Sequence, residues 1–231
     1  SKFYSVGGSG FKRVGDISLD NKIIDHTQDV LIQYAAKIAS FCADADAVWN
    51  EKEETWKVTG DPTEVSFNVF AEKVGVVKKD LEKNNPFIHD IPFSFINKFH
   101  GTVHDTGDKN FLTVVGAPEG IIADAQYVYR DGQKSEMSQE DRDRFVKIAD
   151  ELASRGLRVV VFSVNENVDK TIDGENLPPL TLVGIFGLQD TLREGVAASV
   201  KIAQSDGIKV ALITGDYIET AKALGASAGI Y

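Results

Sequence analysis

Residues 91–115, IPFSFINKFHGTVHDTGDKNFLTVV, contain three short runs in which apolar and polar residues alternate. The runs span 91–97, 99–105 and 111–115, and Thr106-Gly107-Asp108, a typical turn sequence, separates the last two. This pattern predicts an antiparallel meander. Because a strand with alternating residues buries one face, helices from the rest of the chain are expected to flank the sheet.

The residues before the meander predict two helices and a short strand. Apolar residues recur at helical spacing from Asp29 to Ala47, which predicts an amphipathic helix, and a strand is expected at 56–58. Asp61 and Pro62 predict the start of a second helix, ending near Lys73. Aspartate can cap the first N–H groups, and proline needs no hydrogen bond at the first helical position.

The residues after the meander predict a further helix, strands and a surface loop. Ser138 and Asp141 are placed for a capping box at the start of a helix that ends at Gly156. The other predicted elements are strands at 125–129, 157–164 and 180–187, and a polar loop at 165–179.

Beyond residue 188 the pattern changes. Helices are predicted at 192–205 and 217–226, with a strand at 208–213 between them. This alternation is typical of a parallel α/β sheet, whereas the preceding residues predict an α+β fold. We therefore expect a domain boundary near Gln189.

The composition of the chain excludes some classes of protein and of binding partner. The chain has 231 residues, and 25 Lys plus Arg against 35 Asp plus Glu give a net charge of −10. A composition of 42% hydrophobic and 26% charged residues is typical of a folded chain. The negative charge argues against nucleic acid or anionic lipid as a partner. No apolar run approaches the roughly 20 residues of a membrane helix, so we expect a soluble chain without membrane insertion of its own.

Two residue types argue against a disulfide or a metal site. Cys42 is the single cysteine and lies in an apolar helical pattern, so we interpret it as buried. The four histidines, His26, His89, His100 and His104, form no metal-binding signature with it, and no metal ligands are predicted. The chain begins with Ser1 and its only methionine is Met137, which indicates a processed or excised piece.

One motif suggests phosphate chemistry. Thr214-Gly215-Asp216 directly follows the predicted strand at 208–213 and precedes a predicted helix. In parallel α/β sheets ligands collect at the carboxyl ends of strands, and backbone N–H groups at a helix start favour phosphate. The alternative is that Thr214 and Asp216 only cap the helix.

Six segments, in order along nearly the whole chain, resemble those of one family, the P-type cation-transporting ATPases. They are 60–64 (GDPTE), 91–93 with Lys98 (similar to the PFxxxxK segment), 116–119 (the tail of KGAPE), 156–159 (GLRV), 187–190 with Arg193 (similar to the DPPR hinge) and 214–216 (TGD). The resemblance implies that residues 1–188 are the nucleotide-binding domain, an antiparallel sheet flanked by helices. Residues 189–231 are then a fragment of the phosphorylation domain, an incomplete α/β haloacid-dehalogenase-like segment.

The resemblance also implies ligands and roles. ATP would be the nucleotide, with Mg²⁺ in the intact pump, and the partners would be the pump's other domains and membrane helices, with this region at the cytoplasmic face of the membrane. The transported ion would be set by those membrane helices. The implied nucleotide-binding residues are Glu64, Phe93, Lys98, Gly116, Ala117, Arg158, Asp190 and Arg193, and the implied phosphoryl site is Thr214, Gly215 and Asp216. In the family the acid that matches Glu64 accepts a hydrogen bond from the adenine amino group.

Each of these residues also has a purely structural interpretation. Phe93 could stack on adenine or pack into the core, and Lys98 could contact the nucleotide or be a solvated charge at a strand edge. Glu64 lies in the first turn of its predicted helix and could interact favourably with the helix dipole without binding a ligand. Arg158 begins an apolar strand and needs a phosphate or an acidic partner, whereas Asp190 and Arg193 could pair locally.

Several departures from the family pattern bear on activity. Val115 stands where the family has a lysine, residues 190–193 read DTLR, and Tyr217 follows TGD where asparagine is common. The chain contains neither DKTGT, which carries the phosphorylated aspartate, nor GDGxND, and is expected to lie between them. We therefore expect nucleotide binding without hydrolysis.

Two alternatives remain. The chain could be a non-catalytic interaction or regulatory module that has lost nucleotide affinity, because Val115 removes a cation from the expected pocket. It could also be a free-standing phosphatase of the haloacid-dehalogenase type, although no strand ending in a DxD-like nucleophile precedes Thr214.

Overall fold

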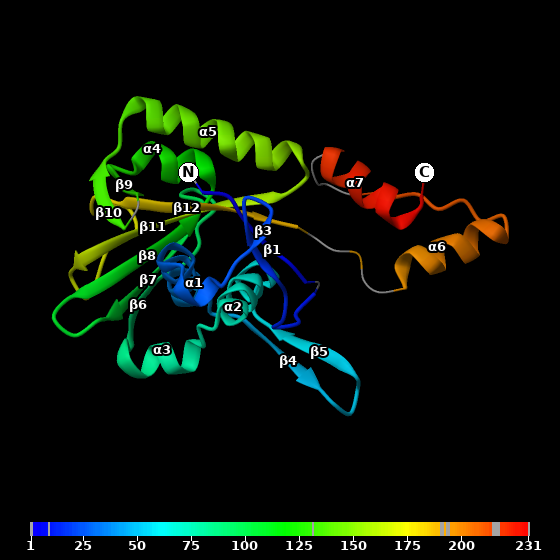
Figure 1. Ribbon diagram of the computed structural model, residues 1–231, viewed down its shortest axis with the longest axis horizontal. Coiled ribbons are helices and arrows are strands. Elements are labelled where there is room, and N and C mark those ends of the chain that lie inside the picture. Colours follow the sequence, from blue (N-terminus) through cyan, green and yellow to red (C-terminus); the bar gives the residue numbers. More distant parts are fainter. Residues whose placement is uncertain are drawn as a thin grey trace.

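The computed structural model describes residues 2–8, 10–130, 132–189, 192, 195–213 and 218–230. A seven-stranded sheet forms its centre, in the order β10-β9-β12-β11-β8-β7-β6 (Figure 1). The strands are β6 Phe87–Ile91, β7 Phe99–Asp105, β8 Asn110–Gly116, β9 Tyr127–Arg130, β10 Gln133–Glu136, β11 Arg158–Val168 and β12 Thr181–Leu188. All neighbours pair antiparallel except β12 and β9, which are parallel.

Helices lie on both faces of this sheet. The helices are η1 His26–Gln28, α1 Val30–Cys42, α2 Pro62–Val74, α3 Lys78–Asn84, α4 Pro118–Asp124, α5 Gln139–Ser154, α6 Val196–Ser205 and α7 Ile218–Ala228. Figure 1 shows α1, α2 and α3 on one side of the sheet and α4 and α5 on the other. The prediction of a sheet flanked by helices is confirmed for this part of the chain.

Two smaller sheets accompany the central one. Strands β1 Tyr4–Val6, β2 Ile17–Leu19 and β3 Lys22–Ile23 form the first, and β4 Asp46–Asn50 and β5 Thr55–Thr59 form a hairpin. The hairpin projects from the body of the molecule (Figure 1). Among the described residues no helix is both long and apolar enough to cross a membrane.

The meander prediction is confirmed for β7 and β8 but is wrong for 91–97. Strand β6 ends at Ile91, and residues 92–98 form a loop before β7. Pro92 has no N–H for the ladder, and Lys98 has a left-handed backbone with φ of 56°. The Lys98 N–H donates to the Ser94 carbonyl at 2.7 Å, which closes the loop.

The first predicted helix is shorter than expected. Helix α1 ends at Cys42, and Asp46 already pairs with Thr59 in the β4–β5 hairpin. Acidic residues are unfavourable at a helix C-terminus, and Asp44 and Asp46 follow α1 directly. The apolar pattern to Ala47 therefore combines a helix and the start of a strand.

The predicted helix starts are confirmed. The Asp61 side chain accepts from the Thr63 N–H at 2.7 Å with Pro62 in the first turn of α2, which ends at Gly75 with φ of 94°. Ser138 and Asp141 form the reciprocal capping box of α5.

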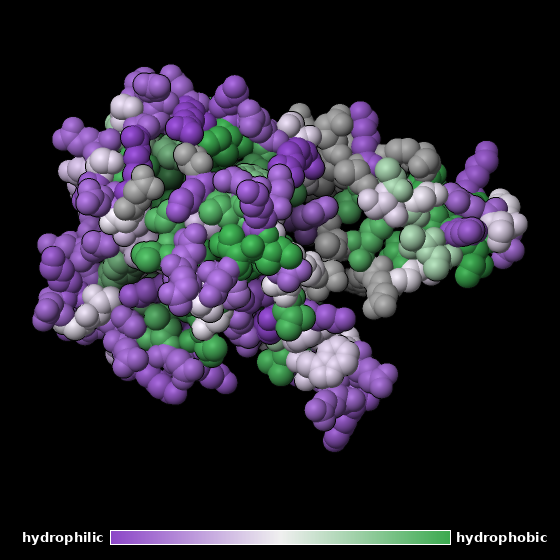
Figure 2. Space-filling model, in the orientation of Figure 1, coloured by the Kyte–Doolittle hydropathy of each residue, from purple (hydrophilic) through white to green (hydrophobic). Residues whose placement is uncertain are grey.

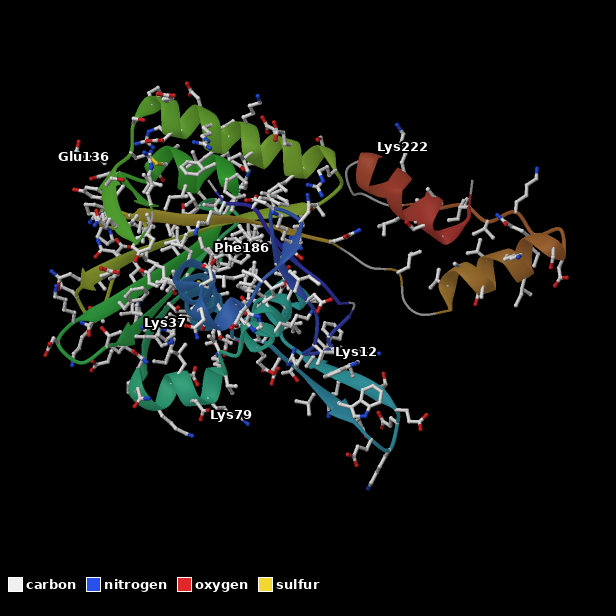
Figure 3. The ribbon with its side chains drawn as sticks, in the orientation of Figure 1. Lys12, Lys37, Lys79, Glu136, Phe186 and Lys222 are labelled. Carbon is white, nitrogen blue, oxygen red and sulfur yellow. The ribbon has the colours of Figure 1, made fainter. Side chains whose placement is uncertain are left out.

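Two hydrophobic clusters fix the sheet between its helices. Val103, Leu112 and Val114 face α4 and α5, and Phe111, Val115 and Phe162 face α1 and α2. Figure 3 shows Phe186 between the sheet and the helices, where its ring meets Phe162 and Phe70 edge-on or tilted. Strands β8 and β11 are covered on both faces, and accordingly much of their sequence is apolar.

The predicted parallel α/β segment is not confirmed. Residues 208–213 belong to no strand, since no described strand lies beside them to pair with their backbone groups. Helices α6 and α7 contact each other and lie apart from the sheet (Figure 1). Ile202 and Ile208 are exposed, as is Ile213 at 94%, and Figure 2 shows apolar side chains on this surface.

Candidate functional site

The start of α2 meets the β6–β7 edge of the sheet through Glu64. Its Oε2 accepts from the Asp44 N–H at 2.9 Å, and its Oε1 lies 3.5 Å from Nδ1 of His100. The other ring nitrogen of His100, Nε2, lies 2.8 Å from Oδ1 of Asp90. His100 therefore links a carboxylate on α2 with one on β6.

Arg158 lies close to the segment that caps α2. Burial raises the pKa of Asp61, but hydrogen bonds from Thr63 and Glu64 and the positive charge of Arg158 hold it below its ordinary value. The charge of Arg158 is the smallest of these effects on Asp61, and the expected phosphate or acidic partner of Arg158 stays a prediction. Two of the family-like segments, 60–64 and 156–159, are thus adjacent in space.

Lys98 binds the segment that follows β8. Its Nζ lies 3.0 Å from Oε1 of Glu119, and its carbonyl accepts from the Ala117 N–H at 3.0 Å. The Glu119 backbone N–H and Lys98 together lower the pKa of the Glu119 carboxyl. Lys98 is exposed and lies in a loop, not at a strand edge.

Gly116 permits this contact. A Cβ at Gly116 would lie 2.6 Å from Cβ of Phe99 and 2.7 Å from the Lys98 carbonyl oxygen. Only glycine fits without a shift of the backbone. Gly116 and Ala117 thus belong to a close backbone crossing between β8 and the loop that carries Lys98.

Phe93 lies in the loop between β6 and β7, and its side chain is not part of the core. It is 55% exposed and meets Phe95 edge-on, with 5.4 Å between ring centroids. The core interpretation of Phe93 is therefore wrong. An exposed ring on a short loop is free to stack on a planar ligand.

Val115 occupies the family's lysine position and is buried. It is 7% exposed, packs in the cluster that includes Phe41 and Phe162, and lies opposite His100 in the β7–β8 register. Its side chain thus contributes apolar contacts next to the polar chain formed by Glu64, His100 and Asp90.

The remaining predicted residues, Asp190, Arg193, Thr214, Gly215 and Asp216, lie outside the described residues. Within the described ranges no group of three His, Cys, Asp or Glu is placed to hold a metal ion. Cys42 is fully buried, and burial raises the pKa of its thiol to about 12.

Sequence reasoning missed Asp90 and the role of His100. His100 was considered only as a metal ligand, and Asp90 was not singled out. The sequence carried no signal for their contact, because it is a diagonal one: Asp90 pairs with Thr102, two residues after His100, and the sequence did not specify this register.

Two cavities lie elsewhere. One of about 410 Å³ is lined by the β4–β5 hairpin, including Trp49 and Lys57. The other, of about 620 Å³, lies between Ile96, Asp124 and the loop at 174–178. Neither is lined by Glu64, Phe93 or Lys98.

Comparisons with known proteins point to one family. A family model described as P-type ATPase, cytoplasmic domain N, matches residues 31–195. The chain is 27% identical to a calcium-transporting ATPase of Bacillus subtilis over 96% of its own length and 25% of that protein. It is 30% identical to calcium-transporting ATPase 1 of Lactococcus lactis, over 75% of the chain and 20% of the relative.

A mammalian relative shows the same coverage. Potassium-transporting ATPase alpha chain 2 of Cavia porcellus is 33% identical over 75% of this chain and 18% of that protein. The chain therefore spans about a quarter or less of the length of these relatives. Because the family model covers most of the chain, the chain belongs to the P-type ATPases and contains their cytoplasmic domain N.

Proposed function

We propose that this chain binds adenine nucleotide, as the cytoplasmic portion of a pump that couples ATP hydrolysis to cation transport across a membrane. The observation that supports it most is the convergence of separate family-like segments. Glu64 contacts His100 on β7, the neighbouring Phe99 pairs with Gly116, and the charge of Arg158 acts on Asp61 in the segment that carries Glu64.

The roles we propose follow from exposure and charge. Phe93 stacks on adenine, since its ring is exposed and base stacking contributes about 1 to 3 kcal/mol. Lys98 and Arg158 supply charge-assisted hydrogen bonds to the nucleotide. Glu64 accepts from the adenine amino group. Thr214, Gly215, Asp216, Asp190 and Arg193 are proposed to act at the phosphoryl end of the nucleotide.

We also propose the domain division at residue 188, with 1–188 as the nucleotide-binding domain and 189–231 as part of the phosphorylation domain. The region would lie at the cytoplasmic face of the membrane. Mg²⁺ in this proposal arrives bound to the nucleotide phosphates, as is usual for this ion.

A titration of the chain with MgATP, followed by amide chemical shifts, tests the proposal. We expect localised shifts at 60–64, 91–101, 115–117 and 158–160, and weaker shifts with MgGTP, whose base lacks the 6-amino group. Absence of shifts at millimolar MgATP would instead support the interaction module that has lost nucleotide affinity.

Hydrolysis is tested separately. The 231 residues contain no DKTGT segment, and phosphoryl transfer depends on an acceptor positioned against the γ-phosphate. We therefore expect no phosphate release from the purified chain. Phosphate release above buffer level that is abolished by Asp216→Asn would overturn this part of the proposal.

A further inference from the structure

The cavity of about 620 Å³ is not part of the proposed nucleotide site. It lies between α4, the loop at 92–98 that leads into β7, and the loop at 174–178 before β12. Figure 1 shows α4 on the face of the sheet opposite α1 and α2, and none of the described side chains proposed to bind nucleotide lines the cavity. Its volume is in the range of cavities that hold small molecules, so the chemistry of its lining defines what it can hold.

The charged side chains that line the cavity are both acidic. Asp124 is the last residue of α4 and Glu175 lies in the loop before β12, and no described lining residue is a lysine, an arginine or a histidine. Arg142 of α5 donates to the carbonyl groups of Ile122 and Ala123 and leaves the Asp124 carboxylate unpaired. Neither carboxylate forms a hydrogen bond or an ion pair with a described residue. The cavity therefore has two uncompensated negative charges.

The asparagines of the lining add further hydrogen-bond acceptors. Nδ2 of Asn97 donates to the Gly174 carbonyl at 3.4 Å, and Nδ2 of Asn176 donates to Oδ2 of Asp173 at 3.0 Å. The Oδ1 atoms of both asparagines accept no hydrogen bond from a described residue. Because the donors of these side chains are engaged and the acceptors are free, the lining favours a ligand that donates hydrogen bonds.

Apolar side chains form much of the remaining lining. Leu180 is 2% exposed, and Phe99 and Leu177 pack against the same core cluster. Ile96, at 91%, is among the most exposed apolar side chains of the described residues. An aliphatic chain would remove this apolar surface from water, which a hydrated metal ion cannot do. In the described part of the chain, moreover, no group of three His, Cys, Asp or Glu is placed to hold a metal ion.

We propose that this cavity binds a linear aliphatic polyammonium ion. The ammonium groups donate charge-assisted hydrogen bonds to Asp124 and Glu175, and the methylene groups between them lie against Phe99, Leu177 and Leu180. The net charge of −10 raises the local concentration of such cations. This site goes beyond the proposed function, since its ligand does not have to be a nucleotide and its lining is separate.

The experiment titrates the whole chain with spermidine and follows amide chemical shifts in about 0.15 M salt, where distant surface charges are largely screened. We expect saturable shifts at 96–99, 120–126 and 174–180. The comparison cation is hexaamminecobalt(III), which has the same charge and N–H donors but no methylene groups. We expect it to bind about threefold or more weakly than spermidine, because it cannot cover the apolar lining.

Two variants test the acidic residues. Asp124→Asn and Glu175→Gln should each weaken spermidine binding by about 3- to 10-fold, the effect of one partly solvated charged contact. Asp108→Asn is the matched control, because it removes the same charge from the exposed turn between β7 and β8, at the other end of β7. Asp124 and Glu175 are both exposed, so melting temperatures should stay nearly constant in the variants.

Three results would overturn the inference. The first is an unchanged spermidine affinity in both Asp124→Asn and Glu175→Gln, and the second is a set of shifts that spread over the surface without saturation. The third is binding of hexaamminecobalt(III) as tight as that of spermidine, because charge alone would then explain the site. None of these results bears on the proposed function, which the MgATP titration tests separately.

Discussion

Lys98 and Glu119 form an ion pair, with 3.0 Å between Nζ and Oε1, at the point where the loop before β7 crosses the end of β8. Glu119 thus binds the ammonium group of Lys98, the same group that we propose binds the nucleotide. Both side chains are more than half exposed, so the pair contributes at most about 1 kcal/mol to stability.

Glu119→Gln is expected to tighten ATP binding by about two- to fivefold, because Lys98 is then free to bind the nucleotide. The melting temperature should hardly change. Glu136→Gln, an exposed acid on β10 (Figure 3), is the control, and calorimetry at low and high salt is the measurement. Equal affinities of the Glu119 variant and the unaltered chain would show that Lys98 does not contact nucleotide.

Phe93→Ala is expected to weaken ATP binding by about 5- to 150-fold, the equivalent of a stack worth about 1 to 3 kcal/mol. Because the ring is exposed, the melting temperature should stay nearly constant. Phe162→Ala is the contrasting variant. Because the Phe162 ring is fully buried, we expect this variant to lose about 3 to 5 kcal/mol of stability. Retained ATP affinity in Phe93→Ala would refute the stacking role.

Val115→Lys is expected to bind ATP more tightly but to melt at a lower temperature. The new ammonium would emerge beside His100 and Glu64, where a charge-assisted contact is worth about 1.5 to 3 kcal/mol before desolvation is subtracted. Its stem would replace a well-packed valine. Val115→Met, similar in length but uncharged, is the control. Weaker ATP binding by Val115→Lys than by Val115→Met would contradict the prediction.

Stability is expected to fall on acidification because of His104. Burial, followed by the charges of Lys78 and Lys37, lowers the pKa of His104 from 6.5 to about 4, and its ring stacks on Phe41 at 4.1 Å. The unfolded state therefore binds more protons between these values. Neutral His104 therefore contributes up to about 3 kcal/mol to the free energy of unfolding. The contribution is fully present above about pH 6.5 and is lost as the pH falls toward about 4.

Urea unfolding at a series of pH values measures this effect. His104→Phe keeps a ring against Phe41 but cannot titrate, so its stability should change less between about pH 6.5 and about pH 4. An equally steep loss in the variant would assign the acid sensitivity to other groups.

Gly116→Ala is expected to cost about 1 to 3 kcal/mol of stability, because the added Cβ collides with Phe99 and with the Lys98 carbonyl. Gly120→Ala is the matched control. It lies in α4, where a Cβ meets only Asn97, 3.9 Å away, and alanine favours the helix by up to about 1 kcal/mol. Thermal melts that rank the two variants in the opposite order would contradict this account of Gly116.

The parts of the fold that were predicted correctly depend on local chemistry. Strands β7 and β8 follow from alternation and a turn within 18 residues, and the starts of α2 and α5 follow from Asp61 with Pro62 and from Ser138 with Asp141. The strand predicted at 208–213 was wrong because a strand also needs a neighbour, which an apolar run does not specify.

The candidate site divides in the same way. Glu64, Phe93, Lys98, Gly116, Ala117 and Arg158 were chosen from short contiguous segments that resemble the family, and their roles stay predictions. Whether Phe93 is core or surface depended on where β6 ends. The contact of His100 with Glu64 depended on the packing of α2 against the β6–β7 edge, and its contact with Asp90 depended on the register of β6 against β7. Neither the packing nor the register is specified by a local sequence pattern.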